Sequence, residues 1–219
     1  MTVSATYPNE ANRRLALLHH ILQKAVDWGY LTTNLADRIK KFKEKRHKLK
    51  LTKEILFEKI YPVADEMLKR AIMLAFHLVQ HENEIKHLKW NEFRLNTHVV
   101  EFIRQKTDEP IVINFSENPI LTAYMEHVKG RRENLCPYII HHQTEKGRKP
   151  YSSFRSMWNR ALTKAGYNEG EFKFKEIRHL ANTTMKDHSI TADKRKGMTG
   201  HQSTAANEIY THPTPTDTY

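Results

Sequence analysis

Residues 173–185 read KFKEIRHLANTTM, and residues 198–213 read MTGHQSTAANEIYTHP. In the first stretch, Arg178 and His179 stand at the start of a segment whose apolar residues recur at helical spacing. In the second stretch, Gly200 and His201 precede Tyr210 in a tyrosine–threonine–histidine run. An arginine can clamp a phosphate, and a tyrosine hydroxyl can attack one. These two stretches therefore contain residue types that could act together on a phosphodiester.

Three upstream segments extend the pattern in the same order along the chain. They are NRRLALLHHILQKAVDWGYLTTNLADRIK (12–40), NEIKHLKWNEF (83–93) and RQKTDEPIVINF (104–115). Together with the two C-terminal stretches, they resemble the tyrosine recombinase (phage integrase) family, specifically its C-terminal catalytic domain with part of its core-binding domain. The resemblance covers nearly the whole chain.

The resemblance implies a set of roles for individual residues. Tyr210 would attack a DNA phosphodiester and form a 3′-phosphotyrosyl bond. Arg178 and His201 would stabilise the charge that develops on the phosphate oxygens. Lys175 takes the position of a histidine in the family's second box, where lysine is also found. Lys106, at the turn of a predicted hairpin, would protonate the departing 5′-oxygen, and the reaction would need neither metal nor cofactor.

The first box of the family is altered in this chain. If Glu84 is aligned with the family's glutamate, His81 takes the place of the first catalytic arginine and Val79 that of the preceding glycine. Neutral imidazole donates one hydrogen bond where arginine supplies a charged clamp, so cleavage should be slower by about 10²- to 10³-fold or more. The sequence thus predicts a site-specific recombinase with an impaired site, or alternatively a catalytically inactive DNA-binding protein of the same fold.

A different class of function is also open. His77 and His81 are four residues apart, a spacing that can bind zinc on one face of a helix, and His87 follows. Residue 78 is leucine, so the segment is not a His-Glu-x-x-His motif. The chain contains 14 histidines, among which such pairs arise by chance. We therefore predict no metal site.

The charge of the chain favours a polyanionic partner. The 36 lysines and arginines exceed the 25 aspartates and glutamates and give a net charge of +11. Residues 38–50, RIKKFKEKRHKLK, supply +7 of this excess, and such a run of charge predicts an exposed linker. We expect duplex DNA to be contacted by this linker and by the histidine of the arginine–histidine pair, that is by Lys40, Lys41, Lys43, Lys45, Arg46, Lys48, Lys50 and His179.

Apolar spacing predicts a mainly α fold with a small antiparallel β-sheet (α+β). Helices are expected at 9–29, 53–60, 62–80, 84–88, 119–133, 152–166 and 176–188, with two further short helices before Tyr210. A hairpin is expected from 98–105 and 109–116, and a short strand at 138–140. Trp90 and Trp158 are expected in the core, and Thr52 is expected to cap the helix that follows it.

The expected domains are a helical remnant of the core-binding domain (1–37), a basic linker (38–51) and the catalytic domain (52–219). The single cysteine, Cys136, and the absence of a long apolar run favour a cytoplasmic protein without a membrane segment. The family resemblance implies further recombinase protomers as partners in a synaptic tetramer on DNA. Off DNA we expect a monomer.

Overall fold

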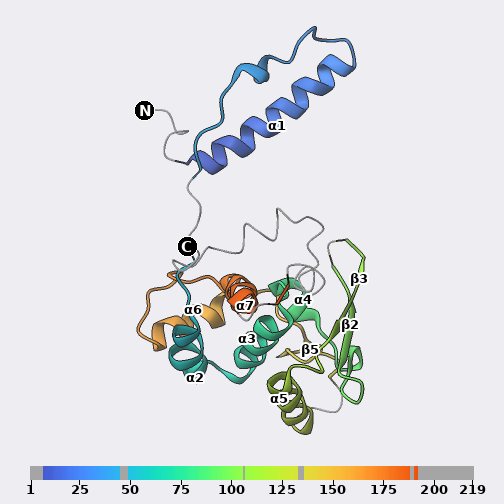
Figure 1. Ribbon diagram of the computed structural model, residues 1–219, viewed down its shortest axis with the longest axis vertical. Coiled ribbons are helices and arrows are strands. Elements are labelled where there is room, and N and C mark those ends of the chain that lie inside the picture. The colour runs from blue at the N-terminus through green and yellow to red at the C-terminus, as the bar shows by residue number, and fades with distance from the viewer. Residues whose placement is uncertain (1–6, 45–48, 106, 133–135, 188–189, 192–219) are drawn as a thin grey trace. The chain divides into compact units, whose positions relative to one another are not determined.

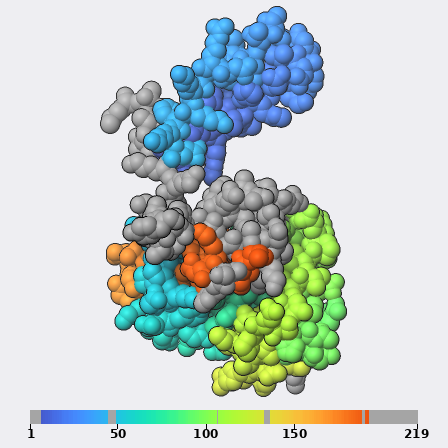
Figure 2. Space-filling view, viewed as in Figure 1, coloured from blue at the N-terminus to red at the C-terminus, as the bar shows by residue number. Residues whose placement is uncertain are grey.

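The computed structural model describes residues 7–44, 49–105, 107–132, 136–187 and 190–191. The chain divides into two compact units, Met1–Lys48 and Leu49–Tyr219. Figure 1 traces the elements of each unit, and Figure 2 shows the corresponding surfaces from the same side.

The first unit is a long helix with a segment that returns along it. Helix α1 spans Pro8–Asp27, and Gly29 adopts a φ of 78° just after it, so the predicted helix and its glycine stop are confirmed. After the 3₁₀ helix η2 (Leu35–Arg38), the chain is tied back to α1 by Asn12, which donates to the carbonyl of Phe42 at 2.9 Å and accepts from its N–H at 2.8 Å. Of the described residues here, only Asn12, Asn34 and Ala36 are buried.

The second unit opens with two helical segments where the sequence predicted a helix at 53–60 and another at 62–80. Thr52 accepts from the N–H of Ile55 at 3.3 Å, which confirms the predicted cap. The π-helix η3 (Ile55–Ile60) runs into α2 (Tyr61–Val63), which holds Pro62 in its first turn. The second predicted helix is nevertheless interrupted, because Asp65 accepts from the N–H of Leu68 at 2.9 Å and starts a new helix, α3 (Glu66–Leu78).

A three-stranded antiparallel sheet follows α4 (Glu82–His87) and the 3₁₀ helix η4 (Trp90–Glu92). Strands β2 (Val99–Ile103) and β3 (Pro110–Asn114) form the predicted hairpin, and β1 (Phe93–Arg94) adds a strand that was not predicted. Val100 pairs with Ile113 and Phe102 with Ile111, so one face of the hairpin is apolar and buried.

The predicted strand at 138–140 is wrong. Tyr138 makes only an isolated bridge to Lys89, and the regular pairing lies further on, between β4 (His142–Thr144) and β5 (Gly147–Lys149). These strands are short and polar, and β5 begins directly after the turn with Gly147 at a φ of 102°. A run of histidine, glutamine, lysine and arginine carries no alternating apolar signal, so the hairpin escapes detection in the sequence.

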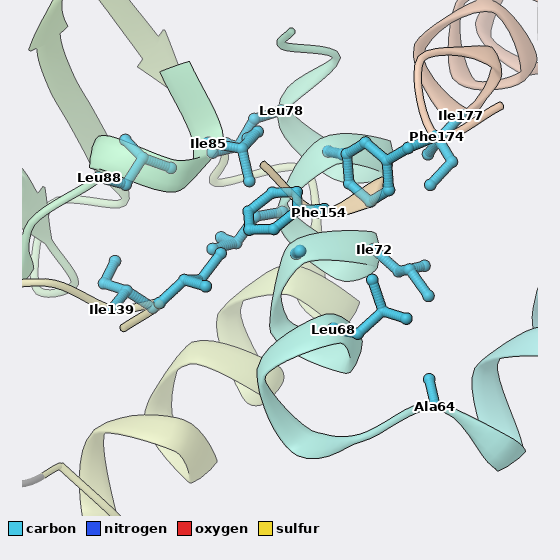
Figure 3. Packing of buried hydrophobic residues seen from close by; sticks show 14 of the residues in the cluster. Ala64, Leu68, Ile72, Leu78, Ile85, Leu88, Ile139, Phe154, Phe174 and Ile177 are labelled. Atoms are coloured by element: carbon cyan, nitrogen blue, oxygen red, sulfur yellow. The ribbon is translucent and has the colours of Figure 1, made fainter. Parts of the chain in front are cut away.

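Three further helices complete the second unit, α5 (Pro119–Gly130), α6 (Arg155–Lys164) and α7 (Glu176–Asp187), each inside its predicted range. Their apolar faces join α3, α4 and the sheet in one core (Figure 3). Phe154 is fully buried there, and its ring centroid lies 5.0 Å from that of Phe174 in an edge-on contact. Trp90 and Trp158 are 8% and 2% exposed, as expected of core residues.

The fold is mainly helical with small antiparallel sheets, which confirms the predicted class. Within the described part of the chain, no helix is long and apolar enough to cross a bilayer.

Candidate active site

Helix α3 contacts both of the elements that carry described residues of the candidate site. It packs against α4, which carries His81 at its N-terminal end, and against α7, which carries Arg178 in its first turn (Figure 1). His81 and Arg178 are 97 residues apart in the sequence, yet both are anchored to the same helix. Part of α7 reaches the surface of the second unit in the view of Figure 2, where it is the orange-red patch.

The direction of α4 is set by a helix break, a turn of the backbone at Val79 that ends α3. This residue ends α3 in the left-handed conformation, with a φ of 56° and a ψ of 35°. Such a conformation is natural for glycine and costs a β-branched residue about 1–2 kcal/mol. The position that the resemblance assigns to glycine therefore keeps a glycine-like backbone, although it now holds valine.

The same break shows that the premise of the zinc hypothesis is wrong. Because α3 ends at Leu78, His77 and His81 do not lie on one face of one helix. The Nδ1 of His77 instead accepts a hydrogen bond from the side-chain amide of Asn118 at 3.0 Å. No cluster of metal-ligating side chains occurs among the residues that the structure describes.

Arg178 is buried within the second unit. Its side chain is only 4% exposed and lies in the first turn of α7, as the sequence predicted. The adjacent Ile177 is fully buried, whereas His81 is exposed and His179 is half-buried. An arginine placed in this way can present a fixed, permanently charged donor group beside the positive end of a helix.

Glu84 is a buried carboxylate that the sequence reasoning used only as an alignment marker. It is 6% exposed in the first turn of α4, and within the described ranges its Oε2 has no hydrogen-bond partner. Burying a charge without a partner is costly, so such a group usually serves a site rather than stability. In the sequence, the available signal was that Glu84 stands next to the apolar residue Ile85. The structure shows that Ile85 is fully buried.

A hollow of about 530 Å³ opens beside Lys175, between the starts of α4 and α6 and the segment that leads into α7. Trp158, Phe172 and Phe174 form its apolar wall, and the indole N–H of Trp158 donates to the carbonyl of Phe172 at 2.9 Å. Arg155 and Lys173 line the same hollow, and sequence reasoning missed both.

The remaining predicted site residues fall into two groups. Lys106, His201 and Tyr210, and in the linker Lys45, Arg46 and Lys48, lie outside the described residues, as do the two short helices expected before Tyr210. The predicted DNA contacts of the linker that the structure describes are exposed, namely Lys40, Lys41, Lys43 and Lys50. Lys175 is exposed as well.

The second unit thus joins a mainly helical fold with Arg178 in the first turn of α7. The model of the phage integrase family matches residues 31–217, and the chain belongs to that family. No curated protein sequence gives a significant match.

Solved structures of three integrases and recombinases share the fold. A lambda integrase dimer bound to a COC′ core site superposes with a TM-score of 0.76 at 20% identity, over 96% of this chain and 61% of that one. The Tn1549 transposon integrase in complex with circular intermediate DNA gives 0.69 at 13% identity, over 95% and 76%. XerA recombinase gives 0.56 at 17% identity, over 77% and 62%. The chain thus spans 61% of the length of the lambda integrase it matches.

Proposed function

We propose that the protein is a site-specific DNA recombinase that binds duplex DNA and cleaves and rejoins its strands through Tyr210. The observation that carries this proposal is the buried Arg178 in the first turn of α7, packed on the same helix as α4. Family membership supports it, as does the binding of lambda integrase and Tn1549 integrase to DNA in their structures.

In the proposed reaction, the hydroxyl oxygen of Tyr210 attacks a backbone phosphorus, and the hydroxyl proton passes to solvent water. A phosphorus–oxygen bond to tyrosine forms, and the bond to the 5′-oxygen breaks. Lys106 gives a proton to the departing 5′-oxygen. Arg178, His201 and Lys175 stabilise the charge on the phosphate oxygens. Rejoining is the reverse reaction with a new 5′-hydroxyl, so the bond energy is retained and no nucleotide is consumed.

His81 supports a second candidate, a DNA-binding protein of this fold that does not cleave. An exposed imidazole at the start of α4 supplies one hydrogen bond in place of an arginine fork. Both candidates use the same basic surfaces for DNA, and they differ only in whether a covalent intermediate forms.

Assembly on DNA follows from the same proposal. A lambda integrase tetramer has been solved on a Holliday junction, and its fold matches this chain with a TM-score of 0.77. We propose that several protomers of this protein likewise act together on paired DNA sites. The exposed Lys40, Lys41, Lys43 and Lys50 would neutralise backbone phosphates beside each site.

The decisive experiment traps the covalent intermediate. The protein is incubated with a pool of nicked duplexes of randomised sequence, and DNA that stays attached to protein in denaturing detergent is recovered and sequenced. The recombinase proposal expects an adduct that Tyr210→Phe abolishes, with Tyr167→Phe as the matched control. Salt-sensitive gel retardation without any adduct would favour the non-cleaving protein, and neither adduct nor retardation would refute both candidates.

A further inference from the structure

The hollow beside Lys175 combines an apolar wall with unequal charges around its rim. Five ionisable side chains line it, three basic and two acidic: Arg155, Lys173, Lys175, Glu82 and Glu169. The candidate catalytic residues Arg178 and His81 do not line it. Lys175, a third candidate catalytic residue, does line it, so the hollow adjoins the candidate active site and shares Lys175 with it.

The two acidic groups already accept hydrogen bonds from the protein. Glu82 accepts from the backbone N–H of Phe154 at 2.7 Å and from the hydroxyl of Ser153 at 3.0 Å, through the same oxygen. Glu169 accepts from the side-chain amide of Asn159 at 3.2 Å. Their carboxylates are thus engaged in holding the loop before α6 and the turn before α7.

The three basic groups have no such engagement. In the parts of the chain that the structure describes, the side chains of Arg155, Lys173 and Lys175 form no hydrogen bond or ion pair. Lys173 and Lys175 alternate with the buried Phe172 and Phe174, so the phenylalanines anchor the segment in the core while the lysines stay exposed. This pattern keeps two ammonium groups at one opening.

The positive potential at the rim comes from the side chains. Helix α6, ten residues long, begins at Arg155 on the rim of the hollow, and Glu82 already offsets its N-terminal dipole by accepting from the N–H of Phe154. Three uncommitted cations around one hollow suit the oxygens of a phosphodiester, because phosphate oxygens accept hydrogen bonds from arginine and lysine side chains.

We propose that this hollow binds a backbone phosphate of the DNA duplex adjacent to the one attacked by Tyr210, held by Arg155 and Lys173. The inference rests on the proposed DNA-binding function and deepens it. Lys175 lies between the two phosphates in this arrangement. Arg155 and Lys173 would act as positioning residues that set where the duplex sits relative to Arg178.

The test measures the affinity of the full chain for a fluorescent 30-base-pair duplex of mixed sequence by anisotropy across a series of salt concentrations. The variant Arg155→Ala/Lys173→Ala is compared with Lys129→Ala/Lys164→Ala, which removes two exposed lysines that do not line the hollow. Arg155→Lys/Lys173→Arg keeps both charges and serves as a rescue. Thermal unfolding of each variant confirms that the fold is retained.

We expect the hollow variant to bind on the order of tenfold more weakly, with the slope of log affinity against log salt reduced by roughly 1, because the contacts to one phosphate are lost. The control should change little, and the rescue should bind like wild type. Equal affinity and slope for the hollow and control variants would overturn this inference and leave the proposed function standing. A wild-type chain that does not bind duplex at all would refute the proposed function, and this inference with it.

Discussion

The side-chain amide of Asn118 donates a hydrogen bond to the Nδ1 of His77 over 3.0 Å, and this bond links the last turn of α3 to the N-terminus of α5. Asn118 also caps α5, because its side-chain oxygen accepts from the N–H of Leu121 at 3.0 Å. Burial lowers the pKa of His77 to about 4. One amide thus fixes a neutral imidazole and a helix start at the same time.

This relationship makes stability depend on pH. In the unfolded chain a histidine titrates near 6.5, so below that pH unfolding is favoured by proton uptake that the folded chain resists until about pH 4. Between pH 7 and pH 5 the free energy of unfolding should drop by up to about 2 kcal/mol from this residue. Urea unfolding of wild type and His77→Gln at both pH values measures it. An unchanged pH dependence in the variant would contradict the expectation.

Replacing the buried Arg70 should lower the free energy of unfolding far more than replacing the exposed Arg160. Its Nη1 donates to the carbonyl of Ile139 at 3.1 Å, and the side chain is buried. Arg70→Met would leave that buried carbonyl unpaired, with an expected loss of about 2–3 kcal/mol in the free energy of unfolding. The matched Arg160→Met removes an exposed ion pair with Asp65 and an exposed hydrogen bond to the hydroxyl of Ser156, and it should cost less than about 1 kcal/mol. Similar losses by denaturant titration would show that the Ile139 bond is unimportant.

At position 79 we expect a glycine variant to be more stable than an alanine variant, the reverse of the order usual within a helix. Both substitutions remove a buried side chain, but only glycine relieves the left-handed backbone. Val79→Gly is therefore expected to be more stable than Val79→Ala by about 1 kcal/mol. Gly would be the less stable of the two at a regular helix position such as Ala71. Urea midpoints of the two variants decide the question, and a less stable glycine variant would argue against the strained turn.

Restoring an arginine at the start of α4 should raise the yield of covalent adduct. His81→Arg returns a charged bidentate donor to an exposed position, so it should fold normally and speed cleavage by about 10²-fold or more if Arg178 and Tyr210 are competent. His87→Arg, on the same helix, is the control. The measurement is single-turnover formation of the phosphotyrosyl adduct. No gain over the control would place the defect elsewhere in the site.

Local chemistry explains which elements could be predicted from the sequence. The β2–β3 hairpin and the helices α5, α6 and α7 have apolar periodicity that matches their burial, whereas the apolar residues of α1 are exposed or half-buried. Gly29 marks the end of α1, and Thr52 caps the helical segment that follows it, as expected. The break at Asp65 was missed because apolar residues continue through it, and only a side-chain cap separates α2 from α3. The strands β4 and β5 were missed because they are polar.

For the candidate site, a motif can name residues but cannot show what surrounds them. The sequence placed Arg178 at a helix start, and it is there, buried. It could not reveal that Glu84 is buried, or that Arg155 lines the same hollow as Lys173, because those facts depend on packing between segments about 20 to 90 residues apart. The roles of Tyr210, His201 and Lys106 remain predictions.

The core of the second unit contains the immediate chain neighbours of the candidate catalytic residues. Phe174 precedes Lys175, and Ile177 precedes Arg178, and both apolar side chains pack with Phe154 and α3 in one cluster. We therefore expect the segment that carries Lys175 and Arg178 to unfold on heating together with the rest of the second unit. Loss of DNA affinity on warming should coincide with cooperative melting of the whole unit, and stabilising substitutions in the core should raise the upper working temperature to the same extent.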